Sequence, residues 1–205
     1  MSRSLSLLAA ALLTAALVAI GAHSASGQTT PTTPSTPGSP GTTGVTIKGS
    51  TVIRIDPILF ETLTAAGAKV RAGKPATATK TGVKFKVTSI SLGKDGQSYL
   101  LKHKGEMRIS TASRSLRIKN PTTSVSQTTG QGELTATVAG KRVKLAALQI
   151  DIGALEQTGS GINADNVNLA MNARLASELN RLLPTPSVLE GATFGKATLK
   201  VITEA

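Results

Sequence analysis

Apolar and basic residues alternate strictly along the middle of this chain. Val83, Phe85 and Val87 are interleaved with Lys84 and Lys86. Because successive side chains of a β-strand point to opposite faces, this order places apolar side chains on one face of a sheet and ammonium groups on the other. The segment is therefore predicted to be a strand with one buried and one exposed face.

The same alternation recurs elsewhere and indicates a mainly β domain. It is repeated at residues 107–109, 116–119 and 143–145, and further strands are expected at 46–55, 134–138, 167–171 and 197–202. The apolar phase slips by one residue at Thr88 and Ser89, which predicts a β-bulge or a tight bend. Glycine-containing turns, such as residues 93–96, separate the strands.

Two segments are predicted to be short helices. In the first, Asp56 is a suitable N-cap, Pro57 fits the first helical position and Gly67 can close the C-terminus. In the second, Asn172 is the expected N-cap. The leucine stripe that follows this cap consists of Leu175, Leu179, Leu182 and Leu183. The helix is expected to end before Pro184 and Pro186. The predicted fold is an antiparallel β-sandwich or open barrel with two short helices.

Residues 1–26 have the composition of a secretory signal peptide. Arg3 precedes an uncharged apolar run at residues 5–22, and the small residues that follow suit cleavage near residues 24–27. A retained membrane anchor is the alternative, since the run approaches the length that spans a bilayer. Residues 27–45 are rich in Thr, Pro, Ser and Gly and predict an extended linker, which leaves residues 46–205 for one β-rich domain. We therefore expect a secreted or cell-envelope protein.

Missing residue types exclude several kinds of site. The chain has no Cys and no Trp, so it cannot form a disulfide, a thiolate metal site or a thiol nucleophile. No segment has the spacing of a serine-hydrolase elbow, a zinc-protease helix or a phosphate-binding loop. We expect a protein that is not an enzyme, with no catalytic and no metal-binding residues.

Positive charge is concentrated in the first half of the predicted domain. The chain carries 23 Lys and Arg against 11 Asp and Glu, a net charge of +12. Residues 48–119 hold 15 basic and 4 acidic residues, whereas residues 120–205 hold 7 of each. Such an imbalance predicts an anionic partner. The candidate contacts are the basic residues at outward strand positions: Arg54, Lys84, Lys86, Lys102, Lys104, Arg108, Arg117 and Lys119. Solvation of exposed strand faces is the alternative explanation.

Seven short motifs follow one another along the predicted domain. They are GSTVIRIDP at 49–57, LTAAGAKV at 63–70, LKHKGEMR at 101–108, LRIKNP at 116–121, LTATV at 134–138, LNRLL at 179–183 and EGATFGKATL at 190–199. Together and in this order they resemble the HtaA-type domain of exported bacterial proteins. The resemblance spans nearly the whole domain and implies a β-rich fold and export.

The HtaA resemblance also implies haem capture at the cell surface, through an axial Tyr supported by a His. His103 matches the family's His-x-Gly position. The axial Tyr is expected between Ile55 and Gly67, where this sequence has Phe60 and no Tyr. Tyr99 and His103 share one face of a predicted strand, but their Cα atoms would lie roughly 13 Å apart, too far to ligate one iron together. His103 could equally be an inward residue held by a hydrogen bond.

Two functions remain open at this point. The first is non-enzymatic capture of a small ligand, haem or another anionic or hydrophobic molecule, by His103 or Tyr99. The second is a structural or adhesive role in which the basic residues bind an anionic envelope polymer or lipid headgroups. No cofactor is expected beyond the haem of the first function. Contact with a membrane is expected only through the signal peptide, before it is cleaved. Nucleic acid is not an expected partner, because the protein is predicted to be exported and has few aromatic rings for stacking.

Overall fold

Antiparallel strands make up most of the structure. The computed structural model describes residues 46–151, 156–158 and 161–204. The signal peptide predicted at 1–26 and the linker predicted at 27–45 lie outside the described residues. The elements in chain order are β1 (Thr46–Ile55), α2 (Pro57–Ala65), β2 (Lys69–Gly73), β3 (Thr77–Ala78), β4 (Gly82–Leu92), β5 (Ser98–Lys104), β6 (Glu106–Ser110), β7 (Ser115–Ser126), β8 (Gln131–Val138), β9 (Lys141–Gln149), β10 (Glu156–Thr158), β11 (Gly161–Met171), α3 (Ala173–Asn180) and β12 (Thr193–Glu204). The mainly β fold with two short helices is confirmed.

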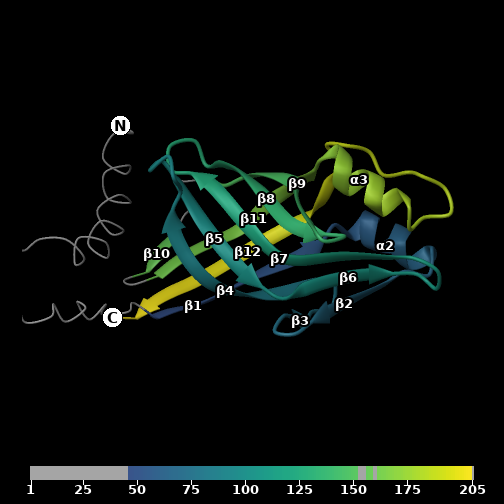
Figure 1. The fold of residues 1–205 in the computed structure, drawn as a ribbon, viewed down its shortest axis with the longest axis horizontal. Coiled ribbons are helices and arrows are strands. Elements are labelled where there is room, and N and C mark those ends of the chain that lie inside the picture. Colours follow the sequence, from purple (N-terminus) through teal and green to yellow (C-terminus); the bar gives the residue numbers. More distant parts are fainter. Residues whose placement is uncertain (1–45, 152–155, 159–160, 205) are drawn as a thin grey trace, which may run out of the picture. The chain divides into compact units, whose positions relative to one another are not determined.

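Eight of the described strands close into a barrel. Neighbouring strands hydrogen-bond in the order β7-β5-β4-β1-β12-β11-β9-β8, and β8 pairs back to β7. The pairs β1–β4, β4–β5, β5–β7, β7–β8, β8–β9, β9–β11 and β11–β12 are all antiparallel. Figure 1 shows the strands wrapping around the barrel and both helices at one of its ends. Closure removes the free edges of this ring, because each of its strands has a hydrogen-bonded neighbour on both sides.

Strand β4 has the alternation and the bulge that the sequence predicts. Val83, Phe85 and Val87 are at most 1% exposed, whereas Lys84 and Lys86 are exposed. The register between β4 and β5 shifts between Val87 and Ser89. This β-bulge absorbs the slip in the apolar phase.

Gly105 divides one long strand into β5 and β6. Its φ is +124°, and a Cβ added there would lie 2.5 Å from the Cβ of Ala76, so a side chain would be both strained and crowded. Opposite it, Asn120 also has a positive φ, of 45°. The Gly105 N–H donates to the Asn120 carboxamide oxygen at 3.2 Å, and the Asn120 N–H donates to the Gly105 carbonyl at 2.8 Å. Beyond this bend β6 pairs with the first half of β7, and β2 extends the sheet beside β6.

Both helices begin at the predicted caps. The Asp56 carboxylate accepts hydrogen bonds from the N–H groups of Ile58 at 3.0 Å and Leu59 at 3.4 Å. The Asn172 carboxamide oxygen accepts one from the Leu175 N–H at 3.0 Å. Each cap satisfies backbone donors that the first helical turn leaves unpaired.

Helix α3 is shorter than its leucine stripe predicts. It ends at Asn180, while Leu182 and Leu183 follow in turns and are still buried. The Asn180 side chain explains the early end, because its amide donates to the Val188 carbonyl and its oxygen accepts from the Val188 N–H, both at 2.8 Å. These bonds fold the following segment back along the helix.

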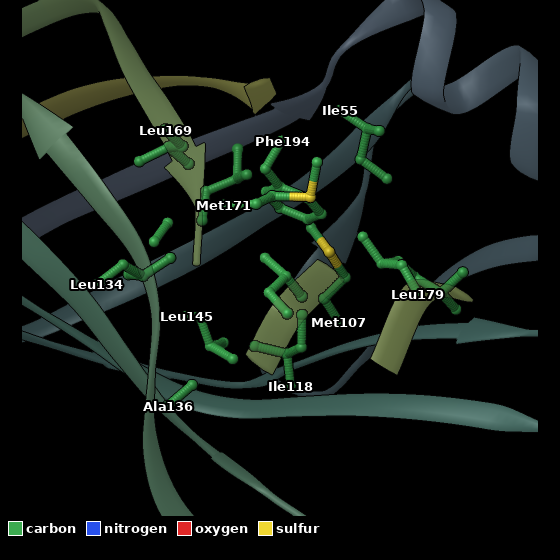
Figure 2. Close-up of a cluster of buried hydrophobic side chains, with 14 of the residues drawn as sticks. Ile55, Met107, Ile118, Leu134, Ala136, Leu145, Leu169, Met171, Leu179 and Phe194 are labelled. Atoms are coloured by element: carbon green, nitrogen blue, oxygen red, sulfur yellow. The ribbon is translucent and has the colours of Figure 1, made fainter. Parts of the chain in front are cut away.

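The core fills the barrel and the space beneath the helices. Figure 2 shows Met107 of β6, Phe194 of β12 and Leu179 of α3 among the side chains of one apolar cluster. None of the three is more than 1% exposed. Leu63 of α2 is also 1% exposed and belongs to the same core. The helices therefore bury the apolar end of the barrel, and the outer faces of the strands are the surface left for binding.

Candidate functional site

His103 lies inside the barrel. It is on the inner face of β5, where it is 5% exposed, and it pairs with Val87 of β4. Leu101, two residues earlier, is on the same face and buried, while Lys102 and Lys104 on the other face are exposed. As predicted, His103 and Leu101 lie on one face of the strand, and Lys102 and Lys104 lie on the other.

Both ring nitrogens of His103 are engaged in hydrogen bonds. Nδ1 lies 3.1 Å from the carbonyl oxygen of Pro121, and Nε2 lies 2.8 Å from Oγ1 of Thr51. A carbonyl can only accept, so Nδ1 carries the hydrogen, and Nε2 of the neutral ring accepts from the Thr51 hydroxyl. Burial lowers the pKa of His103 to about 4, opposed by the bond to Pro121, which raises it. At pH 7 the imidazole is therefore neutral and satisfied on both sides.

The space next to His103 is small and apolar. The cavity has a volume of about 40 Å³ and is lined mainly by hydrophobic side chains, among them Phe85, Leu134 and Leu148. Pockets that take drug-sized molecules have volumes of roughly 300–1,000 Å³. This cavity has room for only a few water molecules at most. A macrocycle such as haem does not fit there without a rearrangement of the barrel.

Tyr99 is separated from His103 by the length of the strand. It pairs with Leu92 of β4 and Val125 of β7, near the opposite end of β5, and it does not line the cavity beside His103. Partial burial raises the pKa of the Tyr99 phenol. The two residues predicted as ligand contacts are therefore not brought together.

The segment in which the HtaA resemblance implies an axial Tyr contains no phenol. The only aromatic ring between Ile55 and Gly67 is that of Phe60, on α2. Phe60 is partly buried and packs against the hydrophobic core. A phenyl ring cannot coordinate iron, so this helix contributes apolar packing at that position.

The eight cations predicted to bind polyanions all lie exposed on the outside of their strands. We call this set the basic outer face: Arg54, Lys84, Lys86, Lys102, Lys104, Arg108, Arg117 and Lys119. Glu106 pairs with two of its members, lying 2.8 Å from Nε of Arg117 and 3.6 Å from Nζ of Lys119. The other six form no ion pair with an acidic side chain of the described residues.

Like charges face one another across neighbouring strands. Lys86 of β4 is directly opposite Lys104 of β5. Arg71 of β2, Arg108 of β6 and Arg117 of β7 stand abreast, and we call these three the arginine row. Like charges directly opposite each other destabilise an antiparallel pair. These pairings concentrate positive charge on the outward face of the strands.

A hollow in the outer surface gathers four lysines. It has a volume of about 690 Å³, and we call it the lysine hollow. The polar side chains that define it are Lys48, Lys84, Lys86, Lys200, Ser50, Thr77 and Asn163. The sequence identified Lys84 and Lys86 as candidates but missed Lys48 and Lys200. The positions of those two are set by the adjacency of β1 and β12, which join the two ends of the domain.

The described part of the chain lacks two other kinds of feature. No three His, Asp or Glu side chains there gather closely enough to hold a metal ion. No helix there is both long and apolar enough to cross a membrane. The expectations of no metal site and no enzymatic activity stay predictions.

Comparison with known proteins gives a clear answer for the fold. Neither a protein-family model nor a curated protein sequence matches this chain. Among solved structures, the C-terminal domain of HtaA from Corynebacterium glutamicum matches with a TM-score of 0.60 at 10% identity, over 78% of this chain and 100% of that one. The N-terminal domain of the same protein matches with a TM-score of 0.59 at 8% identity, over 77% and 98%.

The domain has the HtaA fold. The resemblance drawn from the short motifs is thus confirmed for the architecture, across nearly the full length of both HtaA domains. At identities of 8–10% the likeness is one of fold, and ligand chemistry has to be argued from the side chains of this chain.

Proposed function

We propose that this HtaA-fold domain is an exported, non-enzymatic binding module that holds an anionic polymer of the cell envelope against its basic outer face. The export signal is predicted from residues 1–26, and the HtaA fold agrees with an envelope location. The polymer would lie over β4, β5 and their neighbours, whose outward side chains carry the cations.

The observation that carries this proposal is the facing of like charges across strands. Lys86 and Lys104 occupy directly opposed positions, where mixed charge would be more stable. An anion lying over both ammonium groups offsets that repulsion. Solvation alone gives no reason for the two cations to be opposed, whereas a polyanion contact does.

A salt series on an anionic matrix tests the proposal. The 205-residue chain would be applied to immobilised polygalacturonate and eluted with increasing NaCl, with a neutral dextran matrix as control. We expect retention on the anionic matrix alone and release as salt screens the exposed charges. Retention that does not change with salt, or equal retention on dextran, would contradict an electrostatic contact.

Haem capture is the second candidate, favoured by the HtaA fold and by the buried imidazole of His103. Iron ligation by His103 would require Nε2 to release the Thr51 hydroxyl, because Nδ1 is tied to Pro121. The small cavity would also have to open. The side chains of this chain therefore support haem capture less well than polyanion binding.

Hemin titration decides between the two candidates. We expect no change of the Soret band when hemin is added to the wild type. A Soret change that His103→Ala abolishes would instead establish haem capture. Phe60→Tyr is the gain-of-function variant, since it supplies a phenol in the segment where the HtaA resemblance implies the axial Tyr.

A further inference from the structure

The lysine hollow runs across the outer faces of five strands. Thr77 of β3 is opposite Lys84 of β4, Lys86 of β4 is opposite Ser50 of β1, and Lys200 of β12 is opposite Asn163 of β11. Strands β1 and β12 are neighbours and join the two halves of this row. With neighbouring strands about 4.8 Å apart, the row from β3 to β11 is roughly 19 Å long. That length accommodates several units of a linear polymer.

Side-chain size explains why this part of the surface is concave. Ser50 is small and lies between the long side chains of Lys86 on β4 and Lys200 on β12. Ser50 is thus the floor of the hollow, and the lysines that line it come from the flanking strands and, at Lys48, from β1 itself. A ligand on the floor would be approached by ammonium groups from two sides.

Three lysines of the hollow have no acidic partner among the described residues. None of the described residues that line the hollow is acidic. Lys84, Lys86 and Lys200 form no ion pair within the described residues. Ammonium groups are strongly hydrated point charges that bind carboxylate and phosphate without demanding bidentate geometry. Bound oxyanions would supply the missing counter-charge.

The neutral lining indicates what else the ligand carries. Ser50 and Thr77 provide hydroxyls and Asn163 a carboxamide, which can donate to and accept from the hydroxyl groups of a sugar. The only aromatic residue of the lining is Phe85, whose side chain is buried, so no ring is available for stacking a base. A flat lipid surface would meet the rim of the hollow and not its floor.

We infer that the lysine hollow is the binding site for a strand of anionic polysaccharide, whose carboxylate or phosphate groups contact Lys84, Lys86 and Lys200 while its hydroxyls contact the neutral lining. This inference rests on the proposed function and narrows it from the whole basic outer face to one site. It also adds Lys200, Ser50 and Asn163 to the contacts.

Strand β2 provides a matched control within the same molecule. Lys84→Gln/Lys86→Gln and Lys69→Gln/Arg71→Gln each remove two exposed positive charges, and neither Lys69 nor Arg71 lines the hollow or belongs to the basic outer face. Both double variants change the net charge equally. A difference between them therefore reports the place of binding and not the total charge.

Calorimetric titration of the 205-residue chain tests the site. The probes are polygalacturonate, which carries carboxylates, phosphomannan, which carries phosphates, neutral dextran, and phosphatidylcholine vesicles containing phosphatidylglycerol. We expect at least one of the charged glycans to bind and dextran not to bind. Comparing the two charged glycans shows whether carboxylate or phosphate is preferred. Lys84→Gln/Lys86→Gln should weaken that binding about tenfold, the effect of removing two exposed ion contacts, and Lys69→Gln/Arg71→Gln should change it less than about twofold. Circular dichroism melting of each variant checks that it is folded.

A second variant keeps the test independent of the lysines. Ser50→Glu places a negative charge on the floor of the hollow and should weaken glycan binding at least as much as the lysine pair does. Equal weakening by the Lys84→Gln/Lys86→Gln and Lys69→Gln/Arg71→Gln variants would overturn the site while leaving general polyanion binding in place. Vesicle binding as tight as glycan binding would also overturn it. Failure of both charged glycans and of the anionic matrix would overturn the proposed function itself.

Discussion

Strand β4 presents two chemical environments on one backbone. Its inward residues Val83, Phe85 and Val87 are at most 1% exposed, while its outward residues Lys84 and Lys86 lie in solvent and line the lysine hollow. The inner face contributes apolar burial, and the outer face contributes charge. Because the two sets alternate residue by residue, stability and binding can be changed separately by substitutions at adjacent positions.

The largest expected contrast is between Phe85 and its neighbour Lys86. Phe85→Ala removes a wholly buried ring and should lower the free energy of unfolding by about 3–5 kcal/mol. Lys86→Gln should change it by less than about 0.5 kcal/mol. Urea denaturation followed by circular dichroism measures both. Comparable losses in the two variants would show that the faces are not separable.

The pH dependence of stability probes the inner face through His103. The unfolded imidazole has a pKa near 6.5 and the native one a pKa of about 4, so between these values the unfolded state binds a proton that the native state does not. The free energy of unfolding should be unaffected above pH 6.5 and fall by about 3 kcal/mol as the pH drops to 4.

Urea denaturation at pH 7 and pH 4.5, compared between the wild type and His103→Asn, isolates this contribution. The asparagine keeps a donor near the Pro121 carbonyl but does not titrate. Carboxylates affect both proteins alike, so their effect cancels in the difference. An identical loss of stability on acidification in both proteins would contradict the buried neutral imidazole.

Thr51→Val should have the next largest effect. It leaves Nε2 of His103 as a buried acceptor without a donor and should cost about 1–3 kcal/mol of unfolding free energy at pH 7. Thr88→Val is the control on the outer face, because the Thr88 hydroxyl donates to the Lys102 carbonyl in an exposed position. The control should lose less than about 0.5 kcal/mol in thermal unfolding. Equal losses of unfolding free energy in the two variants would mean that the buried hydrogen bond of Thr51 stabilises the fold no more than the exposed one of Thr88.

The smallest effect is expected at Lys104, and there stability and binding should move in opposite directions. Lys104→Glu replaces like charge opposite Lys86 with unlike charge and should stabilise the fold by a few tenths of a kcal/mol. Retention on polygalacturonate should fall. Lys102→Glu, which faces Ser89 on β4, should weaken retention without the gain in thermal stability. A loss of stability in Lys104→Glu would contradict the repulsion between Lys86 and Lys104.

Local patterns predicted those parts of the fold that depend on local chemistry. The alternation on β4, the bulge after Val87 and the caps Asp56 and Asn172 all follow from side chains within a few residues of one another. β2 and β3 were not predicted, because five residues and two residues are too few to show a period. The end of α3 was also misjudged, since it depends on a bond from Asn180 to a residue eight positions later.

Most of the candidate site could not be predicted because it is made by strand neighbours. The outward direction of Lys84 and Lys86 follows from the alternation, but their meeting with Lys48 and Lys200 requires β1 to lie beside β12. No periodicity within a strand specifies that order. The Thr51 partner of His103 was missed for the same reason, since β4 lies between the strands that carry the two residues.

The hydrogen bond between Thr51 and His103 joins β1 and β5, which share no backbone ladder, and so braces the barrel across the bulge in β4. On protonation both ring nitrogens carry hydrogens, and the Thr51 hydroxyl must turn from donor to acceptor. Thr51 lines a cavity whose other side chains are almost all apolar, so its hydroxyl hydrogen then has few acceptors nearby. Acid therefore reverses the direction of this hydrogen bond without breaking it. Part of the free energy needed to protonate His103 comes from the loss of the donor role of Thr51 on β1.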